Sequence, residues 1–131
     1  MRRMSAKQSV LGIGGVFFKA KDPQGLAAWY AEHLGVPVAA GETYGQFSEE
    51  RAETVWATFP QDTKYFAPSE SSLMINYRVA DLEAMLTQLR AAGVTVEEKV
   101  EESVFGRFGW AIDPEGNRFE LWQPPKAAAP S

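Results

Sequence analysis

The pattern of apolar and polar positions predicts a strand followed by a helix at the start of the chain. An apolar run covers residues 10–20, which is typical of a buried strand. Asp22 and Pro23 then indicate a helix start, because the Asp side chain accepts hydrogen bonds from free N–H groups and proline lacks only a donor that would be unpaired there. Apolar residues recur at helical spacing up to Leu34, and Gly35 suits the left-handed conformation that ends many helices.

The same arrangement returns later in the chain. Asp81 precedes a one-face stripe of leucine and methionine at positions 82, 85, 86 and 89, and Gly93 follows it. An offset of about 59 positions places Asp22 on Asp81, which is the mark of an internal repeat. The later parts also match, "YGQF" (44–47) with "FGRF" (105–108) and "VWATFP" (55–60) with "FELWQP" (119–124). Each copy therefore predicts a strand, a helix and three further strands.

These repeats predict the fold class. We expect an α+β fold in which two βαβββ repeats form one curved mixed sheet, with a concave pocket on one face and the helices on the outer face. A single domain would span residues 10–125, with its repeats at 10–60 and 72–125. The two ends, residues 1–9 and 126–131, are expected to be disordered.

A linker is predicted between the repeats, at residues 61–71. Its sequence, "QDTKYFAPSES", is mainly polar, as connecting segments are. Tyr65 and Phe66 are exceptions, because two adjacent aromatic side chains are poorly suited to solvent. We therefore expect these two residues to cover part of the domain.

Composition narrows the classes of partner and location. The formal charge is −4 and the 13 Lys and Arg residues are scattered, so no basic surface for nucleic acid is predicted. There is no cysteine, which excludes disulfides, thiolate nucleophiles and cysteine metal sites and is compatible with the cytoplasm. The apolar run "VLGIGGVFF" is far shorter than the roughly 20 residues that span a bilayer. We expect a cytoplasmic protein that binds neither nucleic acid nor membranes.

The order of elements, the "DP" helix start, the "LGV" helix end and above all "DPEGNRFELWQP" (113–124) resemble the vicinal oxygen chelate superfamily. This group is also called the glyoxalase, bleomycin-resistance and extradiol-dioxygenase group. The resemblance covers about Val10 to Pro125 and implies the βαβββ fold and a homodimer. It does not imply one activity, because this scaffold carries isomerases, dioxygenases and metal-free drug-binding proteins.

The resemblance also implies where a metal would be held. In metal-dependent members the ligands are His, Gln or Glu on the first strand of each repeat and Glu or His on the last strand. Counting along the chain places Gly15 and Met74 at the first pair of positions and Trp56 and Glu120 at the second. Only Glu120 offers a hard ligand, and one carboxylate does not hold a divalent ion against water. We therefore expect no metal and no cofactor.

Strand alternation predicts which side chains share the concave face with Glu120. The expected pocket combines aromatic walls, an amide and charged groups. Its predicted residues are Phe17, Trp56, Met74, Asn76, Arg78, Glu120 and Trp122. Glu120 is equally compatible with a structural ion pair to Arg78 or Arg118.

Three functions are compatible with such a pocket. The first is a metal-free protein that binds a small, partly aromatic molecule. The second is an enzyme of the same superfamily, of lyase, isomerase or dioxygenase type, in which Glu120 is a general base or a residual metal ligand. The third is a dimeric interaction protein whose pocket has lost its role.

Overall fold

The computed structural model describes residues 7–48 and 53–126. The described residues form eight strands and two helices, as predicted for an α+β chain. The elements, in chain order, are β1 (Gly12–Ala20), α1 (Pro23–Leu34), β2 (Tyr44–Ser48), β3 (Glu53–Pro60), β4 (Leu73–Arg78), α2 (Leu82–Ala91), β5 (Thr95–Val96), β6 (Glu101–Ser103), β7 (Gly106–Ile112) and β8 (Arg118–Gln123).

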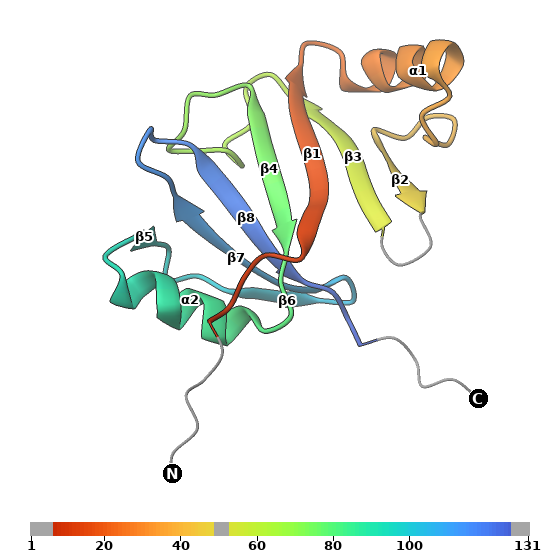
Figure 1. Cartoon of the computed structure of the whole chain (residues 1–131). Helices are drawn as coiled ribbons and strands as arrows, with labels where there is room; N and C mark the ends of the chain where they lie inside the picture. Colours follow the sequence, from red (N-terminus) through yellow and green to blue (C-terminus); the bar gives the residue numbers. More distant parts are fainter. Residues whose placement is uncertain (1–6, 49–52, 127–131) are drawn as a thin grey trace, which may run out of the picture.

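All eight strands belong to one mixed sheet with the order β2-β3-β1-β4-β8-β7-β5, and β6 pairs with β7. Strands β1 and β4 lie antiparallel at its centre, and each has a parallel neighbour from its own repeat, β3 and β8 respectively. Figure 1 shows the two halves on either side of this central pair, with α1 beside β2 and β3 and α2 below β7 and β8. The predicted α+β fold with βαβββ repeats is confirmed.

The repeats differ in the first strand after each helix. In the second repeat this strand is split into β5 and β6, and both pieces pair with β7. In the first repeat it is reduced to a single bridge between Val38 and Gly45. A side chain at Gly45 would come within 2.1 Å of the Pro37 carbonyl oxygen, so the close approach of these strands requires glycine.

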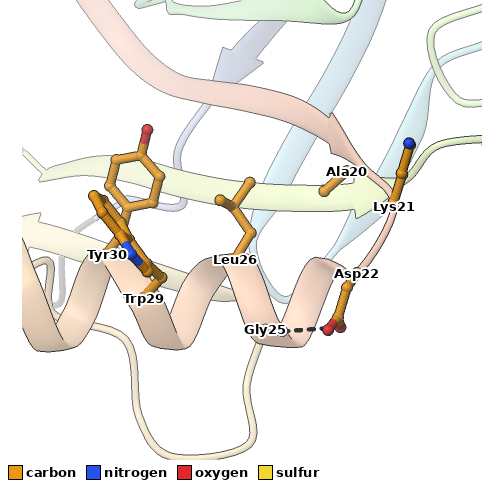
Figure 2. A pocket seen from close by; sticks show the side chains of 7 residues that line it. All are labelled: Ala20, Lys21, Asp22, Gly25, Leu26, Trp29 and Tyr30. Carbon is orange, nitrogen blue, oxygen red and sulfur yellow. Dashed lines mark hydrogen bonds between the residues drawn. The ribbon is translucent and has the colours of Figure 1, made fainter.

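Both helices begin where the sequence predicts. The Asp22 carboxylate accepts a hydrogen bond of 3.0 Å from the Gly25 N–H, as Figure 2 shows, and Asp81 accepts one of 3.0 Å from Ala84 N–H. Helix α1 ends at Gly35, whose φ of 68° lies in the left-handed region. Neither described helix has the length and apolar character needed to cross a membrane.

The two helices are buried to different extents. Helix α2 buries Leu82, Met85 and Leu86 against Leu121 of β8 and neighbouring apolar residues. Helix α1 buries only Ala27 completely, in a cluster with Val36 and Trp56. The second repeat therefore contains the larger part of the helix-side core.

A third cluster lies on the opposite face of the sheet and includes the predicted linker. Phe66 is fully buried and packs with Phe17, Ala57 and Met74 from the central strands. The expectation that the aromatic residues of 61–71 cover part of the domain agrees with this packing.

The predicted disorder at the ends falls mainly on residues 1–6 and 127–131, which lie outside the described residues. Of the remainder, Gln8 is fixed to α2, because its N–H donates to Gln88 Oε1 (2.8 Å) and its carbonyl accepts from Gln88 Nε2 (3.0 Å).

Candidate functional site

The main cavity lies on the face of the sheet opposite the helices and has a volume of about 750 Å³. Residues of β1, β2 and β3 line one side, and residues of β7, β8 and the turn before β7 line the other. The cavity is thus shared by both repeats. Its walls include seven aromatic side chains, those of Phe17, Tyr44, Phe59, Tyr65, Phe105, Phe108 and Trp122.

A second depression, of about 570 Å³, lies along α1 (Figure 2). Its apolar surface comes from Leu26, Trp29 and Tyr30, and its polar groups are Lys21 and Asp22. The Asp22 carboxylate already caps the helix, as the dashed line in Figure 2 shows. The cavity on the concave face is the stronger candidate because it alone of these two contains a buried carboxylate.

That carboxylate is Glu120, of which only 1% is exposed. Asn76 Nδ2 donates to its Oε1 at 2.6 Å, and Trp110 Nε1 donates to its Oε2 at 2.9 Å. The Tyr65 hydroxyl also donates to Oε2. Two of these donors, the indole N–H and the amide N–H, have no acceptor capacity, so the arrangement suits an ionised carboxylate.

The two arginines that were considered as ion-pair partners of Glu120 bind other groups. Arg118 forms a bidentate ion pair with Glu97, with N···O distances of 2.7 and 2.8 Å, and donates to the Tyr65 carbonyl oxygen. Arg78 Nη1 donates to the carbonyl oxygens of Ile13 (2.6 Å) and Glu53 (3.0 Å). The structural ion pair of Glu120 with either arginine is therefore not formed in the described part of the chain.

Burial raises the pKa of Glu120 above its ordinary value of 4.5. Hydrogen bonds from Tyr65, Asn76 and Trp110, in that order, and the nearby charge of Arg118 act in the opposite direction. The pKa of Tyr65 is raised well above its ordinary value by burial and by the Glu120 charge. The proton between the two groups thus belongs to the tyrosine, and Tyr65 remains a donor.

Four of the seven predicted pocket residues line the cavity, namely Phe17, Asn76, Glu120 and Trp122. Met74 belongs to the same face but is covered, with 1% exposed, in the cluster around Phe66.

Trp56 does not line the cavity, which corrects the prediction. It packs on the helix side of the sheet with Ala27 and Val36 and contacts the Tyr30 ring at 4.9 Å. The ungapped match of "VWATFP" to "FELWQP" was displaced by one residue, and in a strand such a slip exchanges the two faces. The β3 residues that line the cavity are Val55, Ala57 and Phe59, together with Glu53, Thr58 and Pro60.

The register also tests whether the site fits a metal. Glu120 pairs with Asn76, Asn76 with Gly15, and Gly15 with Val55, so these four residues form one row across the central strands. A β-bulge between Ile13 and Gly15 accompanies this register.

The row contains one carboxylate and no imidazole. The N–H groups of Asn76 and Trp110 point at the oxygens of that carboxylate. The described residues contain no group of three His, Cys, Asp or Glu that could hold a metal ion. This donor set does not fit a divalent cation.

Sequence reasoning missed two of the three side chains that donate to Glu120, Tyr65 and Trp110. The aromatic pair in the predicted linker was a usable signal for Tyr65. Its ring stacks on that of Phe59, with a centroid distance of 5.4 Å and an interplanar angle of 8°. Trp110 pairs with Glu120 across β7 and β8, and its indole N–H reaches the carboxylate from the neighbouring strand. That contact depends on side-chain orientation, which no pattern along the chain predicts.

The fold is that of a known family. The family model for the glyoxalase-like domain matches residues 15–122, which is most of the chain. The chain belongs to this glyoxalase-like domain family, and the predicted superfamily is confirmed. No curated protein matches the chain in sequence.

Solved structures with the same fold include two epimerases. Methylmalonyl-CoA epimerase from Mycobacterium tuberculosis is 21% identical, with 93% of each chain covered and a TM-score of 0.64. The Streptomyces coelicolor epimerase in complex with 2-nitronate-propionyl-CoA is 17% identical, with 93% of this chain and 100% of that chain covered and a TM-score of 0.66. A glyoxalase/bleomycin resistance protein/dioxygenase superfamily member from Vibrio splendidus 12B01 is 14% identical, with 88% of this chain and 98% of that chain covered and a TM-score of 0.55. At these identities the similarity shows the fold alone.

Proposed function

We propose that this protein binds a small, partly aromatic molecule in the cavity on the concave face, without a metal ion. The observation that carries the proposal is the cavity of about 750 Å³, which joins aromatic walls to one polar patch at Asn76, Tyr65 and Glu120. Pockets of this size and composition are typical of small-molecule sites. The donor set around Glu120 supports the metal-free part, because its carboxylate oxygens accept bonds from groups that cannot ligate a metal.

Binding is tested with a panel of aromatic small molecules, measured by thermal shift and calorimetry. A ligand at about one hundred times its Kd should stabilise the protein by about 2.7 kcal/mol. Phe108→Ala should weaken binding, because Phe108 lines the cavity and stacks on Trp122 at 6.1 Å. Phe47→Ala is the matched control, since Phe47 is 40% exposed and is not part of the cavity wall.

Elemental analysis of the same preparation tests the metal-free part. We expect no stoichiometric manganese, iron, nickel or zinc. A stoichiometric metal that is lost in Glu120→Ala would contradict the proposal. An absence of binding across the panel, together with silent cavity variants, would favour the interaction protein.

An enzyme with Glu120 as general base is the second candidate, and the raised pKa of this buried carboxyl favours it. The three hydrogen bonds to the carboxylate oppose it, because they occupy the lone pairs that would take a proton. If a substrate is found, full turnover by Glu120→Gln would exclude the base.

We also propose a homodimer in the cytoplasm. Exposed apolar side chains on α1, with Trp29 at 51% and Leu34 at 65%, support a surface that a second copy covers. Light scattering should give twice the mass of the 14.5 kDa chain. A mass of one chain at micromolar concentration would contradict the dimer.

A further inference from the structure

The charged side chains that line the cavity have one sign. Among the described residues that line it, the charged ones are Glu53 and Glu120, and both are acidic. The guanidinium of Arg118 lies behind the Tyr65 ring and is paired with the Glu97 carboxylate, and Arg78 donates to carbonyl oxygens of β1 and β3. A cavity with two carboxylates and no lining cation in the described part of the chain disfavours an anionic ligand.

The polar patch also has unused acceptors. Asn76 is 3% exposed, and its Oδ1 is buried without a hydrogen-bond partner among the described residues. Gly14 has no side chain beside this oxygen. A Cβ atom at position 14 would lie 2.2 Å from Asn76 Oδ1 and 2.8 Å from the Trp122 ring in the cavity wall. A carboxylate offers about four lone-pair positions, and Glu120 uses three of them. A ligand that donates hydrogen bonds would satisfy these acceptors.

The aromatic walls suit a positive charge. A cation over the face of an aromatic ring is attracted by the ring quadrupole, and the attraction grows when the pair is removed from water. Phe108 and Trp122 stack in the cavity wall with centroids 6.1 Å apart, and Phe59 lines the opposite side. The Tyr65 ring is not available in this way, because Phe59 stacks on it and the Arg118 guanidinium lies 5.5 Å from its centroid. The cavity therefore combines ring faces, carboxylates and free acceptors.

We infer that the ligand of this cavity is an aromatic or heteroaromatic amine that binds in its protonated form, with its N–H groups directed at Asn76 Oδ1 and Glu120. This inference rests on the proposed function, since it names the class of molecule that the same cavity takes. The rings of Phe59, Phe108 and Trp122 would hold the aromatic part. Glu53 at the start of β3 would add a second negative charge.

The test uses matched probes that differ in charge. For a naphthyl and a benzyl scaffold, calorimetry compares the arylmethylamine, the arylmethanol and the aryl carboxylate at pH 7, with propionyl-CoA as a second anion. We expect the amine to bind about tenfold more tightly than the alcohol, and the anions to bind most weakly. Glu53→Gln should weaken the binding of the amine about threefold and leave the binding of the alcohol unchanged. Glu32→Gln, on the outer helix α1, is the matched control.

The outcomes separate this inference from the proposed function. If the alcohol or a carboxylate binds as tightly as the amine, the amine class is wrong while small-molecule binding stands. If no probe of either scaffold binds at millimolar concentration, both are wrong. Glu53→Gln keeps the test valid even if variants of buried Asn76 or Glu120 fail to fold, because the Glu53 side chain is exposed.

Discussion

Phe66→Ala is expected to lower the free energy of unfolding by about 3–5 kcal/mol. Phe66 is fully buried, packs with Phe17 and Met74, and contacts the Phe59 ring at 5.3 Å. Truncation removes apolar area from the core and leaves a cavity that the central strands cannot fill. Urea denaturation followed by circular dichroism measures the loss.

The matched control is Phe105→Ala, the same substitution at a position that is 67% exposed. We expect a change of less than about 0.5 kcal/mol there. Equal losses of unfolding free energy at the two positions would contradict the packing of Phe66. Residues 61–71 would then be only a linker between the repeats. A large effect at Phe66 alone would show that this segment is part of the core beneath the cavity.

Glu120→Leu is expected to cost about 3 kcal/mol at pH 7, because Leu offers no acceptor to Tyr65, Asn76 and Trp110. Each buried donor left unpaired costs roughly 1–3 kcal/mol, and the removal of a buried charge offsets part of that loss. Glu120→Gln keeps one side-chain oxygen and should lose less. A Leu variant as stable as the wild type would show that the three hydrogen bonds do not stabilise the fold.

The pH dependence of the same comparison tests the charge state of Glu120. Because burial raises the pKa of Glu120 in the folded state, the folded chain holds a proton that the unfolded chain releases above about pH 4.5. The stability of the wild type relative to Glu120→Gln should therefore be highest in acid and fall as the pH rises toward the folded-state pKa. The charge of Arg118 and the hydrogen bond from Tyr65 limit that fall. A relative stability that increases with pH would contradict the raised pKa.

Local signals in the sequence predicted much of the fold because they act over a few residues. Asp22 and Asp81 cap the helices that they were expected to start, and Gly35 ends the first one. Alternation along β4 and β8 placed Asn76, Glu120 and Trp122 on the cavity face, where the structure has them. Period-two alternation is reliable once one residue of a strand is anchored.

The errors arose where pairing between distant strands decides the outcome. Trp56 was assigned to the cavity, and a displacement of one residue in β3 moved it to the helix side. An ion pair of Glu120 with Arg78 or Arg118 was one of two alternatives, but the partners of these arginines are carbonyl groups and Glu97. Long side chains choose among several partners within reach, and that choice depends on the whole packing.

The sequence by itself determined the repeat and the family, because composition and periodicity are properties of the chain. The row of Glu120 was predicted with Met74 and Trp56, but Asn76 and Val55 occupy those positions in the structure. Only the tertiary structure decided what surrounds that carboxylate. Tyr65 from the segment between the repeats, Asn76 from β4 and Trp110 from β7 meet at Glu120 because the sheet brings these distant residues together. Their donors keep a buried charge in an aromatic cavity, since hydrogen bonds compensate part of the cost of its burial.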